Sequence, residues 1–170
     1  MAIYFPNSEL GEVCGESWRI TSNFTGDNNL IGGNSLVNWE ISDDVYGGGN
    51  LSTPILSHSN GQFTFSVLGY YLVIWQHKAY YSDNNHYAQM ELMVSWNSGA
   101  NWDTHGFSTS SVSPNTSDNY YHTSTGSSIV AATNAARLRF NVQMQNNSAV
   151  TNGTSDAQAT GFTLIKVSEI

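Results

Sequence analysis

The residues best suited to chemistry follow a turn-rich segment in the middle of the chain. Trp102, Asp103 and His105 stand within four consecutive positions. An indole offers an apolar face with an N–H at its edge, a carboxylate accepts hydrogen bonds or holds a cation, and an imidazole donates, accepts or ligates a metal. These three residue types together favour ligand binding, and they are the candidate binding residues of the sequence.

Metal binding is the alternative chemistry for such residues. Asp103 with His105, or the segment Asp83-Asn-Asn-His86, offers oxygen atoms and an imidazole that would suit Ca²⁺. The spacings typical of structural zinc, including His-Glu-x-x-His, are absent from the sequence. Asn and Asp also shape turns without binding anything, and this simpler role is the one we expect. The sequence therefore predicts neither a metal nor a cofactor.

Catalytic motifs are missing as well. The sequence contains no Gly-x-Ser-x-Gly, no phosphate-binding loop and no Gly-x-Gly-x-x-Gly. Carboxylates such as Glu40, Asp43, Asp44 and Glu91 could form a glycosidase pair, but the distance that decides this is spatial. We expect Glu91 to pair with a basic residue or to face solvent. The sequence therefore predicts a protein that is not an enzyme.

The turn before the candidate residues has a recognisable pattern. Ser95-Trp-Asn-Ser-Gly-Ala-Asn-Trp102 resembles the Asp-box hairpin, Ser-x-Asp-x-Gly-x-Thr-Trp, with Asn97 in place of Asp and Asn101 in place of Thr. A propeller would need several copies, and the sequence has one. We expect Asn97 and Gly99 to shape a tight turn and Trp102 to fold back over it.

Strand patterns surround this turn. No segment sustains an amphipathic helix, and turn residues such as Asn60-Gly61 separate short apolar or alternating runs. The stretches 107–118 and 146–158 are rich in polar residues and predict exposed connections. The predicted strands are Ser17–Phe24, Ser35–Ser42, Gln62–Leu68, Tyr70–Tyr81, His86–Trp96, Asn119–Ser124, Ser127–Thr133, Ala136–Gln145 and Phe162–Ser168.

The clearest pattern lies between residues 61 and 75. In Gln62–Leu68 apolar and polar residues alternate, which places Phe63 and Phe65 on one face of a half-buried strand. Gly69 then allows the backbone to bend, and the apolar run Tyr71–Trp75 is expected to enter the core. Many β-sandwiches would satisfy this pattern.

Three segments together resemble the C1q/TNF-like jelly-roll domains of bacteriophage virion proteins: Gly61–Trp75, Ala136–Met144 and Gly161–Val167. The resemblance covers residues 16–170 and implies an all-β, two-sheet antiparallel jelly-roll sandwich that forms a homotrimer. Residues 1–15 form a short N-terminal arm in this scheme, without the heptads of a fibre shaft.

The resemblance implies a function on the virion surface. The leading expectation is a trimeric capsid cement or decoration protein that stabilises a phage head by binding the major capsid protein or another virion protein. The alternatives are a host-receptor-binding knob of a tail or head fibre, and a glycan-binding jelly-roll module. Tyr and Trp are more numerous than one core needs, which suits a subunit interface or a host-surface glycan.

Composition limits the other partners. The net charge of −8 disfavours nucleic acid and anionic membranes, which attract clustered Lys and Arg. No apolar run reaches membrane-spanning length, and no export signal is visible in the sequence, which fits release by host lysis. Cys14 is the single cysteine, so it cannot form an intrachain disulfide and is expected to be a buried free thiol.

Overall fold

The computed structural model describes residues 14–25, 29–31, 38–42, 54–81, 87–111, 120–144 and 149–170. These residues contain no helix of the length and apolar character needed to cross a membrane. Their strands, in chain order, are β1 (Gly15–Ile20), β2 (Phe24–Thr25), β3 (Asn29–Ile31), β4 (Trp39–Ile41), β5 (Leu56–Ser59), β6 (Gln62–Phe65), β7 (Gly69–Tyr81), β8 (Tyr87–Ser95), β9 (Asp103–Ser111), β10 (Tyr120–Ala132), β11 (Arg137–Met144), β12 (Val150–Thr151) and β13 (Gly161–Ser168).

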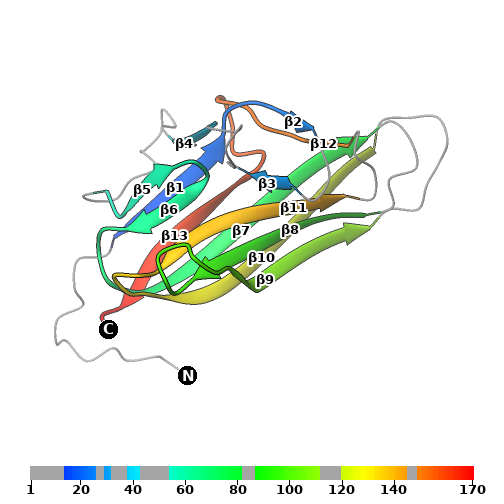
Figure 1. The fold of residues 1–170 in the computed structure, drawn as a ribbon. Coiled ribbons are helices and arrows are strands. Elements are labelled where there is room, and N and C mark those ends of the chain that lie inside the picture. Colours follow the sequence, from blue (N-terminus) through cyan, green and yellow to red (C-terminus); the bar gives the residue numbers. More distant parts are fainter. Residues whose placement is uncertain are drawn as a thin grey trace, which may run out of the picture.

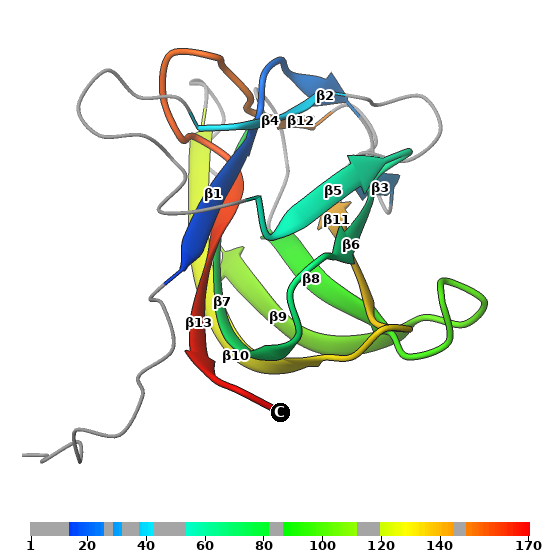
Figure 2. The same ribbon diagram turned by 90° about the vertical axis from the view of Figure 1, so that its left-hand side faces the viewer.

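The strands form two antiparallel sheets (Figure 1). The first sheet has the order β2-β12-β7-β13-β1-β4, and β10 pairs with β7 along the whole of its length. The second sheet has the order β5-β6-β11-β8-β9, with β3 also pairing with β11. The end view shows the sheets enclosing one core, with β9 and β10 packed together where the sheets meet (Figure 2). The predicted two-sheet, all-β jelly roll is confirmed.

The core forms because alternate side chains of the strands point inward. Along β11 every second side chain is buried, from Leu138 to Met144, as the alternating sequence predicts. Aromatic rings fill the centre: Phe140 and Phe162 have centroids 4.7 Å apart, and Phe63 lies 5.3 Å from Trp39 in an edge-to-face contact. Such pairs contribute about 0.5–1.5 kcal/mol each beyond the area that they bury. This cluster fixes the two sheets against each other.

The predicted turn at Asn60-Gly61 is confirmed. Both residues have positive φ, 49° and 73°, and they join β5 to β6 as a two-residue hairpin. Asn and Gly tolerate this backbone better than other residues, and such turns match the twist of the strands. Strand β5 itself lacks a predicted counterpart, because only Leu56 of its four residues is buried.

The expectation that the whole run Tyr71–Trp75 enters the core is wrong. Tyr71, Val73 and Trp75 are buried, but Ile74 keeps 40% of its surface exposed. The segment belongs to β7, whose alternate side chains point to opposite faces of the sheet. Gly69 opens this strand, where a Cβ atom would come within 2.7 Å of the Ser168 carbonyl oxygen.

Two polar stretches predicted as connections contain strands. Residues 103–111 form β9, so residues 107–111 are not a loop, and residues 112–118 lie outside the described residues. Strand β9 escapes the hydrophobic pattern because the inward side chain that it buries is Ser108, whose Oγ accepts a hydrogen bond from Trp75 Nε1 at 3.0 Å. In the second stretch, Val150 and Thr151 form β12.

The predicted strands Asn119–Ser124 and Ser127–Thr133 are one continuous strand, β10. Gly126 lies inside it and pairs with Trp75. The glycine does not interrupt the strand. It is needed because a Cβ atom at this position would collide with the Trp75 ring.

The predicted arm, residues 1–15, lies outside the described residues except for its last two. Gly15 opens β1, and the Cys14 carbonyl accepts a hydrogen bond from the Lys166 N–H at 2.9 Å. Cys14 is a buried free cysteine, as predicted.

Candidate functional site

The hairpin between β8 and β9 is held by side chains that bond to its own backbone. Ser95 Oγ donates to Asn97 Oδ1 at 2.9 Å and accepts from the Gly99 N–H at 2.8 Å. Asn97 Oδ1 also accepts from the Asn101 N–H at 2.9 Å. Ser98 and Gly99 take positive φ, 60° and 90°. The predicted turn is therefore present. Asn97 can stand where the Asp-box pattern has Asp because, of its side-chain atoms, only Oδ1 bonds within the turn.

Trp102 folds back over this turn as predicted. A Cβ atom on Gly99 would lie 3.7 Å from the Trp102 ring. The Arg139 guanidinium, on neighbouring β11, stands 4.3 Å from the centre of the same ring. Among the described residues, the buried Nε of Arg139 has no hydrogen-bond partner. This cation–π contact fixes one face of Trp102.

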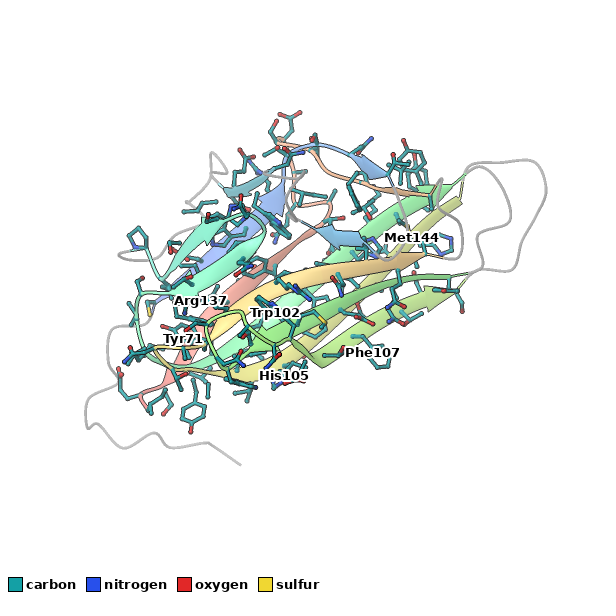
Figure 3. The ribbon with its side chains drawn as sticks, in the orientation of Figure 1. Tyr71, Trp102, His105, Phe107, Arg137 and Met144 are labelled. Atoms are coloured by element: carbon teal, nitrogen blue, oxygen red, sulfur yellow. The ribbon has the colours of Figure 1, made fainter. Side chains whose placement is uncertain are left out.

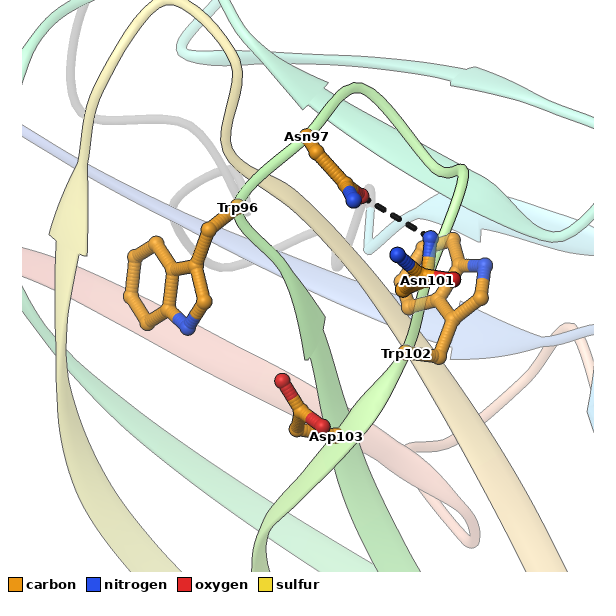
Figure 4. Close-up of a pocket in the computed structure, with 5 residues that line it drawn as sticks. All are labelled: Trp96, Asn97, Asn101, Trp102 and Asp103. Carbon is orange, nitrogen blue, oxygen red and sulfur yellow. Dashed lines mark hydrogen bonds between the residues drawn. The ribbon is translucent and has the colours of Figure 1, made fainter.

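An open pocket of about 580 Å³ lies at this end of the hairpin (Figure 4). It is lined by Trp96, Asn97, Asn101, Trp102 and Asp103. The volume falls in the range of small-ligand sites. The structure thus brings together two of the three predicted binding residues, Trp102 and Asp103.

His105 is not among the residues that line the pocket. Its ring meets Trp96 edge-on, with centroids 6.1 Å apart, and its Nε2 lies 2.9 Å from the Ile129 carbonyl oxygen. His105 therefore supports Trp96. Sequence reasoning missed Trp96, Asn97 and Asn101 as lining residues, although the Asp-box-like pattern includes all three and was a usable signal.

Asp103 supplies the one carboxylate among the residues that line the pocket. Asp103 is exposed, and its side chain makes no ion pair or hydrogen bond with the described residues. No group of three or more His, Cys, Asp or Glu side chains within the described ranges could hold a metal ion. The alternative ion site, Asp83 to His86, lies outside those ranges.

Two of the other candidate carboxylates, Glu40 and Glu91, have structural partners. Glu40 Oε1 accepts from the buried Arg19 Nε at 2.8 Å. Glu91 is 9% exposed and accepts from the amides of Gln89 at 2.7 Å and Gln143 at 3.1 Å. The expectation that Glu91 pairs with a basic residue or faces solvent is wrong, because its own strand β8 and the neighbouring β11 each supply a neutral amide donor. Asp43 and Asp44 lie outside the described residues.

A second surface feature is the outward face of the first sheet. Register places Ile129, Leu72 and Ile165 side by side across β10, β7 and β13. Ile129 is 57% exposed, and the flanking Tyr70 and Ile74 are each about two-fifths exposed. These five residues are the apolar face of the protein. An exposed apolar patch of this kind is a candidate surface for contact with another protein.

The sequence matches no family model, and no curated protein is recognisably related to it. Its fold does have solved counterparts. Murine APRIL at pH 8.5 is similar over 91% of this chain and 99% of that one, with a TM-score of 0.60 and 9% identity. The Eiger TNF structure from S. frugiperda covers 92% of this chain and 95% of its own, with a TM-score of 0.59 and 14% identity. The described chain therefore has a TNF-like jelly-roll fold.

Proposed function

We propose that the protein is a non-enzymatic homotrimer that decorates a bacteriophage head and stabilises it by binding the major capsid protein. The apolar face is the observation that supports the homotrimer. The virion setting is supported by the sequence resemblance to C1q/TNF-like virion domains and by a composition with 11% charged residues.

The apolar face needs a partner. Ile129, Leu72 and Ile165 form a row at one end of the sheet, while the same face of β7 continues into Gln76 and Lys78. A specific interface of standard size buries about 800 Å² on each partner. A second copy of the chain is the occupant that closed symmetry supplies.

The sheet edges support the same assembly. Strands β9 and β10 end their sheets, and β9 carries Phe107, which is 63% exposed (Figure 3). These two strands pack against each other where the sheets meet, and the aromatic side chain gives this edge exposed apolar surface that another chain can cover. In the trimer, the β9–β10 edge of one subunit packs against the apolar face of the next.

Head binding tests the virion assignment directly. Purified protein is added to phage heads that lack decoration protein, and the mixture is sedimented and then heated. We expect the protein to co-sediment in a saturable way and to raise the temperature at which the heads release DNA. Heads that neither bind the protein nor gain resistance would remove the basis for the cement assignment.

A second candidate function rests on the hairpin pocket. Its exposed Trp96 and Asp103 favour a host-receptor-binding knob or a glycan-binding module. A receptor-binding knob would attach to susceptible cells and block infection, whereas a cement protein would do neither.

A further inference from the structure

We infer that the pocket of Trp96, Asn97, Asn101, Trp102 and Asp103 binds a neutral pyranose unit of a glycan. This inference does not depend on the trimer or on the phage setting. It rests on the types of side chain that line the pocket and on how firmly the hairpin holds them.

Trp96 supplies the platform for the sugar ring. Its indole is 41% exposed, an unusual amount for the first residue after a buried strand. The edge-on contact with His105 orients the ring and leaves indole surface open to the pocket. A pyranose carries a patch of C–H groups on one face, and an aromatic ring with a polar surround suits such a face.

Asp103 and Asn101 supply the polar partners. In the view of Figure 4, the Asp103 carboxylate lies between Trp96 on one side and Trp102 on the other. A carboxylate accepts hydrogen bonds from two hydroxyl groups, and an amide both donates and accepts. Neighbouring hydroxyl groups of a sugar present this mixture of donors and acceptors.

The charges select a neutral sugar. Asp103 and the net charge of −8 disfavour uronic and sialic acids. A quaternary ammonium group would need several open aromatic faces, as in aromatic cages. Trp102 cannot offer the face that already holds the Arg139 guanidinium. Trp96 and Asp103 alone make a poor cage.

The site is formed in advance. Ser95, Asn97 and Gly99 bond to one another within the turn, and Arg139 fixes Trp102 from the neighbouring strand. Binding therefore costs little ordering of the protein, which matters for a ligand with few contacts.

The test uses the full chain and a panel of methyl glycosides of glucose, galactose, mannose and N-acetylglucosamine, followed by a glycan array. NMR signals of the Trp Nε1–H groups report binding. We expect at least one glycoside to shift the Trp96 signal with a Kd of about 1–10 mM, as befits a single sugar unit. Trp96→Ala and Asp103→Asn should weaken binding roughly tenfold or more, which corresponds to the loss of one good contact. Trp96→Phe should retain most of it.

Tyr87→Ala is the matched control, because Tyr87 is an exposed aromatic residue at the other end of β8 and does not line the pocket. It should bind like the parent protein. The inference is overturned if no glycoside or array glycan binds, if Trp96→Ala binds as well as the parent, or if tetramethylammonium binds instead of sugars. A trimeric protein without sugar binding would overturn this inference and leave the proposed trimer intact.

Discussion

The Trp75 indole occupies the space that a side chain at position 126 would need. Gly126 is its partner on β10, and a Cβ atom there would collide with the ring. The same indole donates to Ser108 Oγ at 3.0 Å, and Ser108 Oγ lies 3.1 Å from Ser124 Oγ. Trp75 therefore joins β7 and β10 of one sheet to β9 of the other.

Gly126→Ala should destabilise the protein. The added methyl group forces the Trp75 ring to move, and overpacking of a fitted core typically costs about 1–3 kcal/mol. Urea unfolding measures the change. Ser127→Ala, at the exposed neighbouring position, should stay within about 0.5 kcal/mol of the parent. Equal stability of the two variants would show that the ring has room to spare.

Glu16→Ala should also be costly, for an electrostatic reason. The buried Glu16 carboxylate of β1 accepts from the backbone N–H groups of Ile55 at 2.7 Å and Leu56 at 2.9 Å, where β5 begins. Removing it leaves these two N–H groups unpaired, and also the buried Trp18 Nε1–H, which donates to the same carboxylate at 3.3 Å, at about 1–3 kcal/mol for each donor. Glu16→Gln keeps one acceptor and should lose less. The explanation fails if chemical denaturation finds Glu16→Ala as stable as the parent.

Acid should weaken the fold through His77. Burial, with a smaller contribution from the charge of His122, lowers the pKa of His77 from 6.5 to about 3. The unfolded chain therefore binds a proton that the folded chain excludes, so the stability from neutral His77 is complete above pH 6.5 and is lost as pH falls towards 3. The loss between pH 8 and pH 5 should be about 2 kcal/mol.

His77→Gln is the comparison for this pH effect. It retains a group able to bond with Thr151 Oγ1, which lies 3.1 Å from His77 Nε2, but it does not titrate. Its free energy of unfolding should change less than that of the parent between pH 8 and pH 5. Parallel pH profiles for the two proteins would rule out His77 as the titrating group.

Ile129→Glu should separate the subunits without unfolding them. Ile129 is 57% exposed in the single chain, so a carboxylate there is tolerated, whereas in the proposed interface it would be buried against the next subunit as an unpaired charge. Gel filtration at a series of protein concentrations should show that the concentration at which half of the protein is assembled rises at least tenfold. Thr123→Glu is the control at an exposed position on the same face of β10. A trimer unaffected by Ile129→Glu would place the interface elsewhere.

The sequence predicts an element correctly where its local pattern of residue types matches the burial that the fold gives those residues. The alternation from Leu138 to Met144 and the Asn60-Gly61 turn are such cases, because the pattern of side chains and the fold require the same thing. Strand β9 is the opposite case. It buries Ser108 beneath Trp75. The hydrogen-bond partner of this serine is the Trp75 indole on the other sheet, so no local pattern in the sequence reveals the strand.

The candidate site was only partly predictable for the same reason. Trp102 and Asp103 stand out as residue types in a turn, and both line the pocket. Trp96 reads as the end of an apolar strand until the fold leaves its ring 41% exposed. His105 faces Ile129 across the junction of the two sheets, a contact that spans 24 residues of sequence.

The native mass in solution tests the central claim most directly. Light scattering after gel filtration, at several concentrations near neutral pH, measures it without reference to any ligand or capsid. The account predicts three times the chain mass of 18.6 kDa, maintained on dilution. A stable particle of 18.6 kDa at all concentrations would contradict it and leave the apolar face without its proposed partner.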